Sequence, residues 1–163
     1  MPCFRTEWSA PLGAPTMPDR DFALPGDTAH YAPDRPVDVR HVELNVTVDF
    51  EHKTLRGTAA LTVGALFDEV REIALNAAEM TISSVMFASK RRTQPVALDF
   101  DYDGERLMIA LDRPLRYGQE ATITIAYATT PRIGLSFVGP SRGDPAMAVQ
   151  AHTQGQPEYA RYW

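Results

Sequence analysis

Apolar and polar residues alternate along the chain from Val37 onwards. Apolar side chains occupy every second position of Val42–Phe50, which is the period of a strand that buries one face. Residues 51–54 (Glu-His-Lys-Thr) interrupt the pattern as a turn, and the alternation resumes over Leu55–Val63. The two runs predict an antiparallel hairpin whose apolar face is buried in a core.

Further short runs follow at the spacing that is typical of a β-sandwich. These predicted strands are Glu69–Leu75, Thr81–Ala88, Val96–Tyr102, Glu105–Leu111 and Ala121–Ala128. The pair Asp103-Gly104 separates two of them and is a strong signal for a two-residue hairpin of type I′, in which both central residues have positive φ. The predicted fold class is therefore all-β, an antiparallel two-sheet β-sandwich.

The two ends of the chain differ from this middle part. Residues 1–36 contain seven of the 13 prolines, and because proline lacks a backbone donor and fixes φ, we interpret them as an extended Pro-rich leader. Residues 37–150 form the predicted sandwich domain, with a loop over Gly134–Gly143. Residues 151–163 are a separate C-terminal motif.

The C-terminal motif predicts the start of a helix. Pro157 followed by Glu158 suits a first helical turn. Tyr159, Tyr162 and Trp163 then stand at i, i+3 and i+4, which places three aromatic rings on one face. A helix does not normally end with its apolar stripe just begun. We therefore expect polypeptide to follow Trp163, and we expect these rings to form an exposed docking patch.

Composition and charge restrict the possible partners and the cellular compartment. The chain is 44% hydrophobic and 23% charged, which is ordinary globular usage. A net charge of -5 argues against nucleic acid as a partner, and the basic run Lys90–Arg92 is interpreted as a solvated loop. Cys3 is the only cysteine and there is no signal peptide or membrane-spanning run, so we expect a cytoplasmic protein with no membrane partner.

The sequence contains no catalytic or metal-binding constellation of its own. None of the four histidines stands at the i, i+4 spacing that puts two imidazoles on one helix face for zinc. A lone cysteine also excludes a cysteine-based zinc site. We therefore predict no catalytic residue and no metal ligand in this chain.

The segment Thr153–Trp163, T-Q-G-Q-P-E-Y-A-R-Y-W, resembles the end of the N-terminal domain in the aminopeptidase N family of zinc metallopeptidases, which includes leukotriene hydrolase. That family carries T-Q-x-[E/Q]-x-x-x-x-R just before its catalytic domain. Val39–Val46, Leu55–Thr58 and Gly134–Phe137 are similar to the family's opening hairpin and to its later G-L-[Y/F] turn. The resemblance covers roughly residues 37–163.

The resemblance implies a saddle-like β-sandwich that docks on a thermolysin-like catalytic domain. It also implies that Gln156 binds the α-amino group of a peptide substrate and that Gln154 lines the pocket for the substrate's first side chain. Many members of the family have Glu in place of Gln156. Arg161 would be a structural ion-pair partner. The plainer alternative is that both glutamines are polar loop residues that cap the helix.

The zinc motif H-E-x-x-H of that family is absent from this chain. The implied zinc belongs to a parent enzyme whose ligands lie outside this chain, so we expect the fragment alone to bind no zinc and to be inactive. The prediction is the N-terminal domain of a zinc-dependent aminopeptidase, with the catalytic domain of the same parent chain and peptide substrates as partners. The alternative is a free-standing β-sandwich module that binds protein or carbohydrate.

Overall fold

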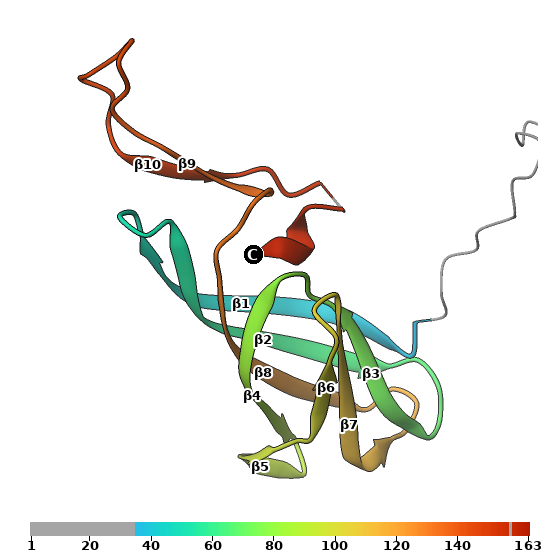
Figure 1. The fold of residues 1–163 in the computed structure, drawn as a ribbon. Coiled ribbons are helices and arrows are strands. Elements are labelled where there is room, and N and C mark those ends of the chain that lie inside the picture. The colour runs from blue at the N-terminus through green and yellow to red at the C-terminus, as the bar shows by residue number, and fades with distance from the viewer. Residues whose placement is uncertain (1–34, 157) are drawn as a thin grey trace, which may run out of the picture. The chain divides into compact units, whose positions relative to one another are not determined.

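The computed structural model describes residues 35–156 and 158–163 (Figure 1). The described residues belong to one compact unit, Asp34–Trp163. Nearly all of the predicted leader, residues 1–36, lies outside the described part. Within that part, no helix is long and apolar enough to cross a membrane.

The larger sheet has five antiparallel strands in the order β1-β2-β8-β4-β5. Their bounds are Val37–Asp49 (β1), Thr54–Ala65 (β2), Glu120–Thr129 (β8), Met80–Ser89 (β4) and Arg92–Ala97 (β5). β1 and β2 form the predicted hairpin, with Asp49 opposite Thr54. The Asp49 carboxylate stabilises the turn because it accepts hydrogen bonds from the backbone N–H groups of Glu51 and His52, both at 2.9 Å.

The smaller sheet has three antiparallel strands in the order β3-β7-β6. They are Val70–Asn76 (β3), Arg106–Leu115 (β7) and Phe100–Tyr102 (β6). A two-stranded sheet pairs β9 (Leu135–Val138) with β10 (Gln150–Thr153). A single 3₁₀ turn, η1 (Ala160–Tyr162), follows near the C-terminus.

The core lies between the five-stranded and three-stranded sheets. The most buried large side chains come from both: Ile73, Leu107 and Ile109 from the smaller sheet, and Val63, Val85 and Ile123 from the larger. In β8 every second residue is buried over the whole strand, as expected of a central strand with one face on a core. The prediction of an all-β, antiparallel two-sheet sandwich is confirmed.

Several predicted boundaries differ from the structure. The strand predicted over residues 96–102 is two strands, β5 and β6, which belong to different sheets. The loop predicted over residues 134–143 contains β9. In the β6–β7 hairpin, φ is positive at Gly104 (+95°) but not at Asp103, so the type I′ prediction is wrong. The predicted helix start is the short 3₁₀ turn η1.

The apolar face of β1 is the largest departure from the sequence prediction. Val42 and Leu44 are 49% and 45% exposed, although their alternation predicted burial. β1 is an edge strand of the larger sheet, and three strands do not cover the whole face of five. The periodicity correctly predicted which side chains share a face, but not whether another layer covers that face.

The two edges of the larger sheet differ. β1 has 13 residues and contains no proline, whereas β5 has six residues and includes Pro95. Proline cannot donate a ladder hydrogen bond and is therefore suited to an edge strand.

Candidate functional site

The predicted site residues, Gln154 and Gln156, lie on the loop between β10 and η1. The backbone N–H of Gln154 donates to the carbonyl oxygen of Gly134 at 2.7 Å. The carbonyl oxygen of Gln156 accepts from the N–H groups of Tyr159 and Ala160 at 2.8 and 3.2 Å. The loop is therefore fixed by its backbone on either side of the two glutamines.

The side chains of Gln154 and Gln156 are both exposed. The hydrogen bonds recorded among residues 35–156 and 158–163 involve their backbone atoms only. The Gln156 backbone carbonyl closes the turn, as a helix-capping residue would, while its carboxamide takes no part in the cap. Both carboxamides are free to contact a ligand or a neighbouring domain.

Gly134 lets the C-terminal segment approach the sandwich closely. Its φ is +82°, and a Cβ atom at this position would lie 2.5 Å from the Tyr159 carbonyl oxygen and 2.9 Å from Trp163 Cδ1. Trp163 packs on the buried cluster Leu55, Tyr127 and Leu135. A residue larger than glycine would have to push this segment away.

The three C-terminal rings are not the exposed patch that the sequence predicted. Tyr159, Tyr162 and Trp163 are each partly buried, because η1 folds back over the end of the sandwich (Figure 1). The indole Nε1 of Trp163 is buried and has no hydrogen-bond partner among the described residues.

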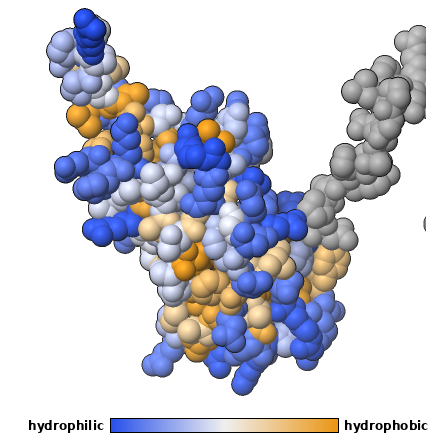
Figure 2. Space-filling view, viewed as in Figure 1, coloured by the Kyte–Doolittle hydropathy of each residue, from blue (hydrophilic) through white to orange (hydrophobic). Residues whose placement is uncertain are grey.

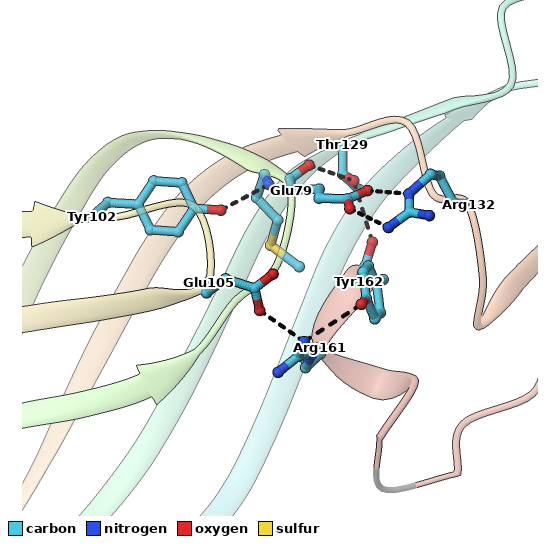
Figure 3. Close-up of polar contacts among 8 residues, drawn as sticks. Glu79, Tyr102, Glu105, Thr129, Arg132, Arg161 and Tyr162 are labelled. Carbon is cyan, nitrogen blue, oxygen red and sulfur yellow. Dashed lines mark hydrogen bonds and ion pairs between the residues drawn. The ribbon is translucent and has the colours of Figure 1, made fainter.

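One ion pair joins η1 to the sandwich, and a second pair, formed by residues outside η1, lies beside it (Figure 3). Arg161 Nη2 lies 2.7 Å from Glu105 Oε2 in the β6–β7 turn. Arg132 Nε lies 2.6 Å from Glu79 Oε2 just before β4, and a second, Nη2 contact makes this pair bidentate. The guanidinium groups of Arg161 and Arg132 lie 5.2 and 5.8 Å from the centroid of the Tyr162 ring, within cation–π range. The predicted ion-pair role of Arg161 is confirmed.

Backbone contacts reinforce this cluster. The N–H of Ala78 donates to the Arg161 carbonyl oxygen at 2.7 Å, and Thr129 Oγ1 donates to that of Tyr162 at 3.2 Å. Glu79 itself has φ +56°, a left-handed conformation that non-glycine residues seldom adopt. The main chain of the C-terminal segment is thus tied to the β3–β4 connection and to β8.

The charges of the cluster stabilise one another. The hydrogen bond from Arg132 lowers the pKa of Glu79 below its usual value, and the nearby charges of Arg132 and Arg161 act in the same direction. The pKa of Arg132 is raised, chiefly by its hydrogen bond with Glu79. Because these groups are exposed to solvent, the pair contributes modestly to stability.

An apolar groove of about 520 Å³ opens beside the C-terminal turn. The exposed β1 residues Val42 and Leu44 form one wall, and Arg161 and Trp163 contribute to another. Neither Gln154 nor Gln156 lines it. Sequence reasoning missed this groove, although the apolar stripe of β1 was its signal.

The described residues contain no group of three or more His, Cys, Asp or Glu side chains that could hold a metal ion. The part of the chain that the structure describes therefore does not fit a zinc site. His52 instead contacts Asp49 at 2.9 Å at the tip of the β1–β2 hairpin.

Comparison with known proteins identifies relatives among leukotriene A-4 hydrolases and leucine aminopeptidases. Leukotriene A-4 hydrolase of Xenopus laevis is 27% identical over 106 residues, which are 65% of this chain and 17% of that protein. Leucine aminopeptidase 2 of Neurospora crassa is 27% identical over 131 residues, 75% of this chain and 19% of that protein. The chain thus spans less than a fifth of the length of these curated relatives.

Solved structures agree in fold. A zinc metallopeptidase from Deinococcus radiodurans, crystallised with a Tyr-Ser-Ala substrate, matches with 25% identity and a TM-score of 0.52 over 61% of this chain and 22% of that one. Yeast leukotriene A4 hydrolase matches with 20% identity and a TM-score of 0.59 over 78% of this chain and 20% of its own. The family model for the peptidase M1 N-terminal domain matches residues 29–163. The chain therefore belongs to the peptidase M1 N-terminal domain family, the β-domain found in zinc aminopeptidases and leukotriene A4 hydrolase.

Proposed function

We propose that this chain is the substrate-recognition domain of a zinc aminopeptidase that removes N-terminal residues from peptides. Gln156 accepts a hydrogen bond from the α-ammonium group of the peptide, and Gln154 lines the pocket for the first side chain. The observation that carries the proposal is that both carboxamides are exposed on a loop whose backbone is fixed on either side. Such a loop can present two side chains to a ligand without rearranging.

The chemistry of a carboxamide suits this role. Its oxygen accepts hydrogen bonds and its nitrogen donates them. A hydrogen bond from an ammonium group is charge-assisted, and such bonds are stronger than neutral ones. A neutral Gln156 attracts the ammonium less than the Glu of many family members would, so an acid elsewhere in the enzyme would have to supply the remaining attraction.

The zinc and the bond-breaking groups would come from a catalytic domain in the same parent polypeptide. In such a site zinc polarises the scissile carbonyl and activates water. In this proposal the present chain contributes substrate recognition and the catalytic domain carries out hydrolysis. We propose that the catalytic domain docks beside the C-terminal turn, where the apolar groove lies open next to Trp163. The lone Cys3 is compatible with a cytoplasmic location, which we retain as part of the proposal.

The test uses the full-length product of the gene that contains this sequence. We expect Gln156→Ala to lower kcat/KM for amino-acid anilides by about 10- to 100-fold, since a hydrogen bond to a charged group contributes about 1.5–3 kcal/mol. Gln156→Glu should retain or increase activity. Gln150→Ala, an exposed glutamine on β10, is the matched control and should leave the kinetics unchanged.

N-acetylated substrates separate amine recognition from general damage. If Gln156 binds the ammonium, Gln156→Ala should reduce the enzyme's preference for free over acetylated N-termini. An unchanged preference, or equal losses for Gln156→Ala and Gln150→Ala, would contradict the proposed role.

A further inference from the structure

Cationic side chains gather around the β4–β5 turn and the β7–β8 connection. The β4–β5 turn lies at the bottom of Figure 1. We call them the basic cluster: Arg40, Lys90, Arg91, Arg92, Arg113 and Arg116. The acids among them are fewer: Asp68, Asp112 and Glu120. This local excess of positive charge stands out in a chain whose formal net charge is -5.

The acids near the cluster are already engaged. Glu120 lies between two cations, with Arg40 at one carboxylate oxygen and Lys90 Nζ 3.2 Å from the other. The hydrogen bond with Lys90, followed by the one with Arg40, lowers the pKa of Glu120 below its usual value. Asp112 Oδ2 lies 2.6 Å from Arg92 Nη1. Three cations of the cluster thus share two carboxylates.

The other three cations lack such partners. Arg91, Arg113 and Arg116 are exposed, and none forms an ion pair with any residue that the structure describes. The carboxylate of Asp68 is turned to the backbone, where it accepts from the N–H of Tyr117 at 3.0 Å. Uncompensated guanidinium groups in one place raise the local concentration of anions.

Two of these three arginines, Arg91 and Arg113, border a recess in the surface. Arg91, Arg92 and Arg113 line one hollow of about 220 Å³, and a second hollow of about 200 Å³ adjoins it, sharing Arg91 and Gln119. Each is smaller than the pockets that enclose whole drug-sized ligands. In Figure 2 this lower end carries strongly hydrophilic side chains beside the apolar surface of the sandwich.

We propose that the hollow between Arg91 and Arg113 binds a phosphoryl group, supplied by a soluble phosphorylated molecule or by a phospholipid head group. A guanidinium presents two parallel N–H donors that match two phosphoryl oxygens, and it keeps its charge at any physiological pH. Arg91 lies in the β4–β5 turn and Arg113 lies in β7, so two separate elements converge on one anion. The glutamines of the proposed aminopeptidase site lie on the β10–η1 loop and take no part, so this proposal is independent of that function.

Isothermal titration of the 163-residue chain with pyrophosphate, against sodium chloride at matched ionic strength, is the first test. The double variant Arg91→Gln/Arg113→Gln should weaken pyrophosphate binding by about tenfold or more, since it removes charge-assisted hydrogen bonds. The control Arg56→Gln/Arg142→Gln removes the same charge from exposed positions outside the cluster and should change affinity by less than about twofold, because distant charges are screened.

The outcomes are distinct. The proposal would be overturned if titration with pyrophosphate gave no heat of binding, or if the affinity for pyrophosphate fell equally in both double variants. Co-sedimentation with phosphatidylcholine vesicles that contain phosphatidic acid identifies the source: retention that is lost in Arg91→Gln/Arg113→Gln indicates a lipid head group, whereas pyrophosphate binding without retention indicates a soluble ligand. Circular dichroism of both double variants excludes misfolding as the cause of any loss.

Discussion

Replacing Gly134 with alanine should detach the C-terminal segment from the sandwich. Gly134 has φ +82°, and an added Cβ would lie 2.5 Å from the Tyr159 carbonyl oxygen and 2.9 Å from Trp163 Cδ1. One of these neighbours is backbone, so it cannot rotate away as the tip of a flexible side chain would. The substitution therefore forces one of two segments to move: the backbone around Gly134, or the C-terminal segment that carries Gln154 and Gln156.

Two costs add at this position. An L-residue in the left-handed conformation loses about 1–2 kcal/mol, and inserting a methyl group into a packed contact adds about 1–3 kcal/mol. A substitution at Gly118 allows the two costs to be measured separately. Its φ is also positive, at +73°, but no heavy atom lies within 4 Å of its Cβ position, so no steric contact is added. Gly118→Ala should therefore show only the first cost, about 1–2 kcal/mol, and Gly134→Ala about 2–5 kcal/mol unless the segment releases.

Urea denaturation and indole fluorescence together distinguish unfolding from release. In a Trp8→Phe background Trp163 is the only tryptophan, so its emission reports on the C-terminal segment. Gly134→Ala should either lower the unfolding midpoint more than Gly118→Ala does or shift Trp163 emission to the red in the native state. Equal midpoints for the two variants, together with unchanged emission, would refute the close-packing argument.

Three further predictions follow from burial and charge. Ile109→Ala should destabilise the chain by about 2–5 kcal/mol in chemical denaturation because it opens a cavity between the sheets; a loss below 1 kcal/mol would mean that the two sheets do not share this core. Val42→Thr should change stability by less than about 0.5 kcal/mol, since Val42 is 49% exposed; a large loss would show that its face is covered. Because Arg132 lowers the pKa of Glu79 below its usual 4.5, the ionised pair contributes stability above that pH and loses it as the pH falls through the lower folded-state pKa. Glu79→Gln should therefore flatten the acid side of the pH–stability profile, and an unchanged profile would argue against the pair.

Much of the fold could be predicted from local pattern. The alternation in β1, β2 and β8 predicted long antiparallel strands, and the turns after Asp49 and before Arg106 carried clear signals in the sequence. The sheet order could not be predicted in this way, because β2 pairs with β8 across a separation that no local pattern records. The exposure of Val42 follows from that order, since it places β1 at the edge.

Short strands escaped the sequence analysis for a different reason. β9 and β10 have four residues each, which is too short for a period of two to stand out. Tertiary pairing forms them, with Leu135 opposite Thr153. This pairing also places Gly134 beside the loop of Gln154, a proximity that the sequence alone does not contain.

The predicted site residues came from a motif rather than from periodicity. Their exposure was expected of polar loop residues, but the contacts that fix their loop were not predicted. Arg161 was assigned an ion-pair role without a partner, and the structure supplies it in Glu105, 56 positions earlier in the chain. Ion pairs between such distant residues depend on the fold and leave no short-range signal.

The two edges of the larger sheet differ in their capacity to pair with an additional strand. Pro95 removes a donor from the short β5 margin, whereas the 13 residues of β1 offer a long row of unused peptide groups above an apolar face. An extended polypeptide can therefore continue the ladder only next to β1, and a sixth strand there would lengthen the sheet and place its own side chains beside Val42 and Leu44 on the apolar face.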